Sequence, residues 1–526
     1  MVAASTLPIN TNASALQMAQ TIFGNGATVS GASYSGSSYS SGIYSNGDSV
    51  APGVTPSDTG VILSTGRASS FTNSSGQSNQ STARSTNTGG QNNHPDFNAA
   101  AGARTYDASY LDVDFVPTGS LMTLQFVFSS EEYPEFTNSL YQDFIGVWVN
   151  GSFVDLSVGN GDVDPANIST TSNANLFHNN ANDAFNTEMD GFTVTMSLTM
   201  PVNAGQTNSI RIGIADVLDS SFDSNLLIAA DSVQTVLIAQ DDSYHLTAPG
   251  QIKTIDILGN DIRPTSATLT ITHINGVAVT AGSSVVLTTG QTITLNADGT
   301  FTMLAASTVE DFNFTYTIDD GTDTATGFVL VDAVPCFVRG TRILTEHGYV
   351  PVERLAPGAQ IKTRDNGFQP LRWIGERRTE ARGKHAPICI RANTFGRHKE
   401  LWVSPLHRIL IRDSLAELLF GEYEVLVAAR DLVNDSSVRV MQGGEVSYFH
   451  LLFDQHEVVY SEGLPSESFL PGPQLANSFE EEVAAEIYGL FPEIDPATGH
   501  GYSPAARRTL KPYEAQLLRI PECKVA

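Results

Sequence analysis

One cysteine and one histidine in the second half of the chain are the side chains best suited to chemistry. Cys336 is the first of only three cysteines in 526 residues, and Ser404 and His407 follow it in a Ser-x-x-His segment. A cysteine thiol has an ordinary pKa of about 8.5, so modest electrostatic help gives a nucleophilic thiolate. Histidine carries protons near neutral pH. The pattern indicates a nucleophile with a proton donor.

The reaction open to Cys336 is attack on the peptide bond that precedes it. Its sulfur and the Pro335 carbonyl belong to neighbouring residues, and such fixed proximity can be worth about 7–11 kcal/mol of barrier. An N-to-S acyl shift yields a thioester and an amine that must be protonated. We expect His407 to supply this proton and Ser404 to orient the ring by a hydrogen bond. The alternative is a buried inert thiol with a core histidine.

Short strands would have to position these residues. Turn residues such as Gly340-Thr341 separate strand-like segments. These segments are residues 350–355, 360–363, 368–375, 401–410 and 448–459. An all-β module over 335–470 is the prediction. In the tail, 471–526, a capping box of Ser478 and Glu481 and the segment 513–518 predict short helices that pack onto this module.

Length and charge bound the rest of the chain. A chain of 526 residues predicts about three to four domains. Its net charge is −28, and only six of its 28 Lys and Arg precede Cys336. So acidic a first half should repel nucleic acid and anionic lipid, and we expect no nucleic-acid partner. The sequence contains no apolar run of 18 or more residues, so no membrane-spanning helix is predicted.

The cysteine content and the N-terminal residues indicate where in or outside the cell the protein is found. Three cysteines cannot build a disulfide framework, and without a CxxC pair a structural zinc site is not expected. The first residues lack the basic and apolar regions of a secretory signal. We expect a protein that is secreted or held at the cell surface by a non-Sec route.

The first 240 residues predict a β-sandwich or jelly-roll-like domain. Residues 11–24 read as a helix with Asn12 as N-cap and with Leu16, Ala19 and Phe23 on one face. Residues 67–104 are polar, low-complexity sequence and predict a long mobile loop. The predicted strands are 60–64, 111–115, 121–128, 144–149, 192–200 and 209–214.

Carboxylates gather in two places of this domain. They are Glu131, Glu132 and Asp143, and then Asp216, Asp219 and Asp223. Carboxylates collected at strand ends without nearby Lys or Arg are costly unless a cation or water neutralises them. Ca²⁺ prefers such oxygen ligands and is the metal we expect here. A solvated loop face is an equal alternative.

Residues 241–334 predict a smaller immunoglobulin-like sandwich. Alternating strands recur there at short, regular spacing. The module resembles the cadherin-like modules of bacterial adhesins, whose repeated Asp and Asn residues often bind Ca²⁺. One copy favours a spacer role.

Two further resemblances cover most of the remaining chain. Residues 128–136, with Asp143 and the segment 214–224, make residues 10–238 similar to the bacterial choice-of-anchor L domain. This family implies an exported or surface-attached β-rich module, hence a surface ligand. Residues 336–345, Ser404-x-x-His407 and 448–469 resemble the Hint fold of hedgehog C-terminal domains and inteins. That resemblance covers 335–470 and implies an all-β, horseshoe-shaped module.

The Hint resemblance assigns roles to individual residues. Cys336 matches the nucleophile, His407 the histidine that activates the scissile bond, and Ser404 stands where the family usually has threonine. An aspartate commonly follows the tyrosine of the terminal block, but His450 occupies roughly that place and Asp454 lies nearby. His456 matches a later histidine of the block. We expect these three to assist.

The end of the module decides the expected outcome. Splicing needs a His-Asn end followed by Ser, Thr or Cys, and the residues after Gly463 lack it. We therefore expect cleavage after Pro335, with water, an amine or a thiol as acceptor and with no cofactor. The rival interpretation is a surface adhesin whose Hint domain is inactive. A cysteine protease acting in trans is poorer, because no helix pattern follows Cys336.

Overall fold

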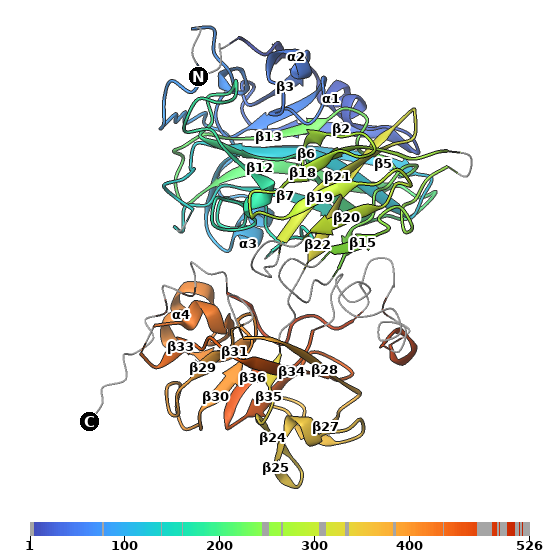
Figure 1. Cartoon of the computed structure of the whole chain (residues 1–526). Helices are drawn as coiled ribbons and strands as arrows, with labels where there is room; N and C mark the ends of the chain where they lie inside the picture. Colours follow the sequence, from blue (N-terminus) through green and yellow to red (C-terminus); the bar gives the residue numbers. More distant parts are fainter. Residues whose placement is uncertain are drawn as a thin grey trace. The chain divides into compact units, whose positions relative to one another are not determined.

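The computed structural model is mostly β, with 41% strand and 9% helix, as predicted. It describes residues 5–75, 78–137, 139–159, 161–244, 252–264, 267–304, 312–331, 336–381, 386–434, 436–470, 487–491, 494, 502–510, 515 and 518. The chain divides into two compact units (Figure 1). The N-terminal unit comprises 1–242, 252–304 and 312–330, and the C-terminal unit contains 331–526. No helix in these described ranges is long and apolar enough to cross a membrane.

Two antiparallel sheets build the first sandwich of the N-terminal unit. One has eight strands: β1 (Ile9–Asn10), β3 (Ser41–Tyr44), β4 (Gly60–Ser64), β13 (Ser224–Ala229), β6 (Leu121–Ser130), β10 (Gly191–Thr193), β9 (Phe177–Asn179) and β11 (Met196–Pro201), the last pairing β6. The other has five: β2 (Ala27–Ser35), β5 (Thr105–Pro117), β12 (Asn208–Val217), β7 (Phe144–Val149) and β8 (Ser152–Phe153).

Alternating side chains fill the space between these sheets. Leu124, Phe126 and Phe128 of β6 share one core with Ile210 and Ile212 of β12. Successive side chains of a strand point to opposite faces of the sheet, so every second residue of each strand lies on the inner face. The predicted hairpin at Asn150-Gly151 joins β7 to β8, where both turn residues adopt positive φ of 51° and 81°.

The helices of this unit differ from the prediction in two places. Helix α1 spans Ala15–Ile22 and its N-cap is Ser14, which forms a capping box with Gln17, so Asn12 lies outside it. Ala19 and Phe23 are buried as predicted, but Leu16 is 45% exposed, and Met18 and Ile22 complete the buried face. The segment predicted as a mobile loop contains η1 (Ala68–Ser70) and α3 (Pro95–Ala101), and Phe97 anchors α3 in the core. The polar composition concealed that anchor. The other short helices are α2 (Gly47–Val50) and η2 (Ala174–Leu176).

A second, smaller sandwich completes the N-terminal unit. Its sheets are β14 (Asp242–Ser243), β22 (Thr324–Val331), β21 (Phe312–Asp319), β16 (Thr270–Ile274) and β17 (Val277–Ala278), and β15 (Ile252–Ile255), β20 (Phe301–Leu304), β19 (Thr292–Leu295) and β18 (Ser284–Val286). Gln125 binds this module directly: its Nε2 donates to Thr324 O, and its Oε1 accepts from Thr326 Oγ1. The small sandwich is therefore docked on the first one.

The C-terminal unit is built on two further sheets. A six-stranded sheet has β28 (Trp373–Glu380), β34 (Glu445–Leu452), β23 (Phe337–Val338), β30 (Leu401–Val403), β29 (Ile388–Ile390) and β33 (Val438–Val440). An eight-stranded sheet has β27 (Phe368–Pro370), β26 (Gln360–Lys362), β24 (Arg342–Thr345), β35 (Val458–Ser461), β36 (Leu464–Glu467), β31 (Arg408–Arg412), β32 (Glu424–Ala428) and β25 (Gly348–Pro351). Its described residues include the helices α4 (Ser414–Phe420), η3 (Val352–Arg354) and η5 (Ala429–Leu432).

The described part of the tail packs on this unit. Ile487, Phe491 and Ile494 join Trp373 and Leu452 in one apolar cluster. Leu510, Ala515 and Leu518 enter the main core. Residues 487–490 are helical, while the predicted capping box of Ser478 and Glu481 lies outside the described residues.

Candidate active site

Strand register brings Cys336 to two of the predicted residues. Cys336 immediately precedes β23, which lies between β34 and β30. Phe337 pairs with Phe449 of β34 on one side and with Val403 of β30 on the other. Antiparallel pairing then sets the preceding residue, Cys336, opposite His450 and Ser404. Strand β23 therefore brings Cys336 next to two residues that are 68 and 114 positions away in the sequence.

Both neighbours contact the reacting atoms of Cys336. The Cys336 backbone N–H donates to Ser404 Oγ at 2.8 Å, and the Ser404 N–H donates to the Cys336 carbonyl at 2.9 Å. Cys336 Sγ lies 3.5 Å from His450 Nε2. The amide nitrogen is the one that a cleavage after Pro335 would expel. Pro335 itself lies outside the described residues.

The thiol sits in an apolar environment. Cys336 is 4% exposed and clusters with Ala381, Val446 and Tyr448. Burial raises the pKa of the thiol well above its ordinary value, and the Arg377 charge and a hydrogen bond with Ser404 offset only part of that. The resting sulfur is therefore protonated near neutral pH, and a base must take its proton before it can attack.

His407 is close to this centre but does not have the predicted partner. Its ring packs edge-on against Phe337, with centroids 4.4 Å apart. Among the described residues neither ring nitrogen has a hydrogen-bond partner, and Ser404 meets His407 through the backbone, since His407 N–H donates to Ser404 O at 3.1 Å. The Ser404 hydroxyl thus serves the Cys336 amide, a role that sequence spacing did not indicate.

The protonation of His407 is set by burial and by nearby charges. Burial lowers the pKa of the imidazole to about 4. The Glu467 carboxylate acts in the opposite direction, while the charges of Arg408 and His456 add to the effect of burial. His407 is therefore neutral at pH 7, and only Glu467 favours its protonated form.

The two other predicted assisting residues lie elsewhere. His456 is buried, with Nε2 at 3.5 Å from Glu467 Oε2. The Asp454 side chain is 58% exposed and forms an ion pair with Arg372 at 3.2 Å. Of the three predicted assisting groups, His450 contacts the sulfur and His456 belongs to a neighbouring buried network. Asp454 is at the surface.

Glu467 is the site residue that sequence reasoning missed. It lies in the stretch 463–469 that carried part of the family resemblance, where it ends strand β36. The signal available in the sequence was a single charged residue between the apolar Leu464 and Phe469, because a carboxylate that such neighbours bury needs a partner.

The predicted carboxylate cluster of the first sandwich is buried and divided. Glu132 Oε2 accepts the Asp143 N–H at 2.8 Å, and Asp143 shares a side-chain hydrogen bond with Asp216. Glu131 is fully buried, and no hydrogen bond reaches either carboxyl oxygen within the described part of the chain. Asp223 instead accepts the Thr86 N–H at 2.6 Å.

Most of these carboxyl groups hold their protons. Burial raises the pKa of Asp143 to about 8 and that of Glu131 to about 9, and it raises those of Glu132, Asp216 and Asp223 as well. Asp219 is only half-buried and accepts the Ser221 N–H. Among the residues that the structure describes, no three His, Cys, Asp or Glu form a group that could hold a metal ion. Calcium binding by these residues stays a prediction.

Comparison with known proteins follows the same division of the chain. The Choice-of-anchor L domain family matches residues 6–234, the bacterial Ig domain family 234–332 and the Hint domain family 335–473. No curated protein matches the chain. Among solved structures, the crystal structure of the gp41-1 intein matches at 8% identity over 26% of this chain and 98% of that chain, with a TM-score of 0.17. Along its length the chain therefore matches, in order, the Choice-of-anchor L domain, the bacterial Ig domain and the Hint domain.

Proposed function

We propose that the Hint domain cleaves its own chain between Pro335 and Cys336 by an N-to-S acyl shift, without splicing. The observation that carries this proposal is the pairing around Cys336. Ser404 Oγ lies 2.8 Å from the nitrogen that would leave, and His450 Nε2 lies 3.5 Å from the sulfur that would attack. Each atom of the reacting residue has a group suited to its proton.

The first step is activation of the thiol. His450 takes the proton from Sγ, because the raised pKa of the buried thiol leaves almost no thiolate without a base. The sulfur then adds to the carbonyl carbon of residue 335. Attack within one chain needs no diffusion of a substrate, which is why a buried cysteine can serve here.

The second step is departure of the amine. The carbon–nitrogen bond breaks, its electron pair stays on the Cys336 nitrogen, and that nitrogen gains one proton. Ser404 Oγ is in hydrogen-bond contact with this nitrogen and can pass the proton on. The proton that His450 took from the sulfur reaches this nitrogen by way of His407, the predicted acid, and Ser404 Oγ, so that both histidine rings are neutral again after the transfer.

The third step releases the acyl group. Water attacks the thioester carbonyl, its hydroxyl joins the carbon of residue 335, and the sulfur leaves with a proton. The products are residues 1–335 with a free carboxylate and residues 336–526 with an N-terminal cysteine. A thiol or an amine in place of water would give a thioester or an amide at residue 335.

Intact mass measurement of the purified full chain tests this proposal. Incubation near pH 7 with and without dithiothreitol should yield masses for residues 1–335 and 336–526. Cys336→Ala should give the full-length mass alone. Ser404→Ala should slow the appearance of fragments by about 100-fold or more, because a positioned proton-transfer group is typically worth about 10²–10⁴-fold. Cleavage at the same position in Cys336→Ala would refute the acyl shift.

A binding function at the cell surface is the second candidate, and one observation favours it. A pocket of about 400 Å³ opens beside β2, β5 and β12, lined in part by Asp96, Asp112, Asp114, Trp148 and Arg211. Its volume is within the range of small-ligand sites, which is about 300–1,000 Å³. A surface-attached binding protein with an inactive Hint domain would stay full length in dithiothreitol. Its ligand affinity would fall in Arg211→Met, because Arg211 is the cation of the pocket lining and pairs there with Asp96 and Asp112.

A further inference from the structure

The Glu467 carboxylate is the centre of a buried charge network next to His407. Its side chain is fully buried. Oε1 accepts the backbone N–H of Arg408 at 2.7 Å, and Oε2 lies 3.2 Å from Arg408 Nη1. Ile409 of β31 pairs with Ser466 of β36, and this register sets Glu467 opposite Arg408, the residue after His407.

His456 joins this network from the other side with a defined tautomer. Its Nδ1 accepts the backbone N–H of Ala506 at 3.0 Å. A neutral imidazole that accepts at Nδ1 carries its hydrogen on Nε2. That nitrogen lies 3.5 Å from Glu467 Oε2. The ring therefore presents its N–H edge to Glu467.

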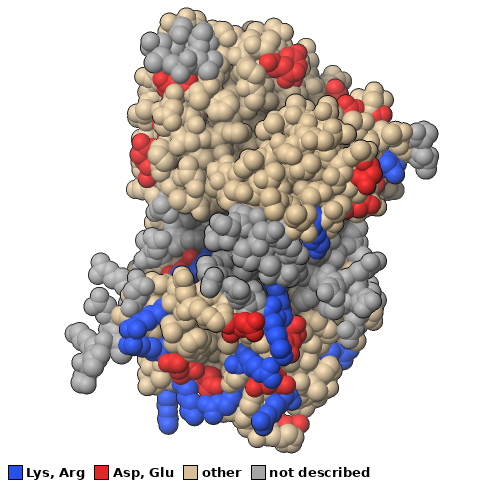
Figure 2. All heavy atoms as spheres, in the orientation of Figure 1, with Lys and Arg blue, Asp and Glu red and all other residues tan. Residues whose placement is uncertain are grey.

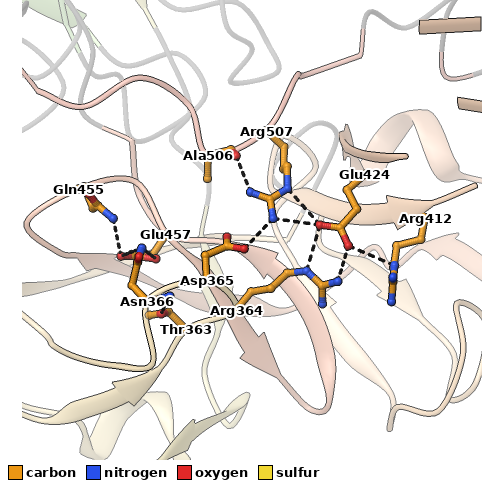
Figure 3. A network of polar contacts seen from close by, with 10 residues as sticks. All are labelled: Thr363, Arg364, Asp365, Asn366, Arg412, Glu424, Gln455, Glu457, Ala506 and Arg507. Carbon is orange, nitrogen blue, oxygen red and sulfur yellow. Dashed lines mark hydrogen bonds and ion pairs between the residues drawn. The ribbon is translucent and has the colours of Figure 1, made fainter. Parts of the chain in front are cut away.

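The segment that fixes His456 is itself anchored from several directions. Arg507 pairs with Glu424 and Asp365, and Arg364 and Arg412 converge on the same Glu424 (Figure 3). The Leu426 N–H donates to Arg508 O, and the Leu510 N–H donates to Leu426 O, both at 2.8 Å. Residues 502–510 thus complete the Hint domain although they follow residue 473, where the family match ends.

Proton transfer through His407 places a positive charge in a buried position. An isolated buried ion costs several kcal/mol unless an opposite charge faces it. The charged or titratable groups around the ring are Glu467, Arg408 and His456, and only Glu467 is an acid. Burial opposes its ionisation, but Arg408, His456 and His407 outweigh this and lower the pKa of Glu467 to about 2. The carboxylate is therefore charged throughout the neutral range.

We propose that Glu467, held by Arg408 and flanked by the His456 that residues 502–510 fix, is a positioning residue that stabilises the protonated His407 ring during self-cleavage. The inference rests on the proposed function. The proposed site then includes residues outside the Hint family match, because Ala506, which fixes the His456 ring, lies beyond residue 473, where that match ends.

Cleavage kinetics of three full-length variants test the role in the reaction. Glu467→Gln keeps the side-chain size and removes the charge, and it should slow cleavage at pH 7 at least tenfold. Its deficit should shrink toward pH 5, where His407 needs less help to bind a proton. Glu467→Asp should recover most of the rate.

The matched control is Glu457→Gln. Glu457 is also a buried carboxylate, 2% exposed, and its partners are Asn366 and Gln455, as Figure 3 shows. The Glu457→Gln variant should cleave within about twofold of the wild type, since Glu457 is not among the groups that act on the His407 ring. Equal slowing in the Glu457 and Glu467 variants, or an unchanged pH profile in Glu467→Gln, would overturn the positioning role.

A measurement without cleavage separates this inference from the proposed function. In a Cys336→Ala chain with labelled histidines, the His407 imidazole is titrated by NMR, with Glu467 present or replaced by Gln. The midpoint should move to lower pH in Glu467→Gln, a tenfold or larger loss in proton affinity, and stay in Glu457→Gln. An unmoved midpoint overturns the inference even where the wild type cleaves. Absence of cleavage in the wild type overturns the proposed function alone.

Discussion

The two compact units bury carboxyl groups in opposite ways. In the N-terminal unit Glu131 has no hydrogen-bond partner among the described residues, Asp143 shares a hydrogen bond with Asp216, and burial raises the pKa of each. In the C-terminal unit Glu467 faces Arg408, and its pKa is lowered to about 2. The N-terminal unit buries several protonated acids beside one ion pair, that of Glu188 with Arg84, whereas the C-terminal unit buries Glu467 as an ionised partner of Arg408.

The supply of cations explains the difference. Only six of the 28 Lys and Arg precede Cys336, and on the face that Figure 2 shows, Lys and Arg gather over the C-terminal unit. A buried acid without a cation neutralises itself by keeping its proton, whereas one beside a guanidinium stays ionised. With few cations available, the N-terminal unit keeps most of its buried acids protonated, and the Glu188–Arg84 pair is its exception.

The largest expected effect is loss of the buried pair in the C-terminal unit. Glu467→Leu removes the anion and leaves Arg408 and His456 without it, which should lower the free energy of unfolding of this unit by about 3–5 kcal/mol. Denaturant unfolding, followed by a probe in each unit, measures the loss. A cost below about 1 kcal/mol would remove the distinction between the units.

Opposite responses to pH are the second prediction. A raised acid pKa contributes stability that is present below the unfolded value and lost as pH rises, here toward about 8 for Asp143 and about 9 for Glu131. Lowered values act in reverse: the contribution of His407 is lost as pH falls from about 6.5 to about 4, and that of Glu467 as it falls toward about 2.

Calorimetric scans across pH check these signs. Between pH 8 and pH 5 the transition of the N-terminal unit should move to higher temperature and that of the C-terminal unit to lower temperature. A parallel shift of both transitions would contradict the assigned protonation states.

Neutralisation of one acid in the N-terminal unit should have a smaller effect of the opposite sign. Glu131→Gln removes a group that must take up a proton on folding, so the unit should gain about 1–3 kcal/mol at pH 8. The gain should vanish near pH 4, where the unfolded chain is also protonated. Urea unfolding at pH 8 and pH 4 measures the free energy of unfolding of the variant and the wild type. A variant less stable than the wild type at pH 8 would show that Glu131 is ionised in the folded protein.

The smallest effect concerns the partly exposed pairs of the tail. Arg507→Met removes two of the ion pairs that hold residues 502–510 and keeps the apolar stem, so the cost should be about 0.2–1 kcal/mol. The variant should be most distinct at low salt and least distinct at 1 M salt. A salt-independent loss would indicate packing instead of charge.

Much of the architecture could be predicted because strand alternation is local. The strands at 60–64, 144–149 and 209–214 lie where the pattern of two indicated, and the three families follow in the predicted order. The start of α1 and the presence of α3 were missed, since Ser14 competes with Asn12 as a cap and Phe97 is one apolar anchor in polar sequence. Caps and single anchors are decided by packing.

The candidate site shows the same boundary between sequence and tertiary structure. The sequence alone determined that Cys336 opens a new module and that a Ser-x-x-His segment accompanies it, because the change of composition at Cys336 and the motif are both local features of the chain. Only tertiary structure decided that Ser404 holds the Cys336 amide, that His450 meets the sulfur and that Glu467 faces Arg408. Contacts of this kind depend on which strands become neighbours, and long-range strand register is a property of the packed sheets, not of any one segment.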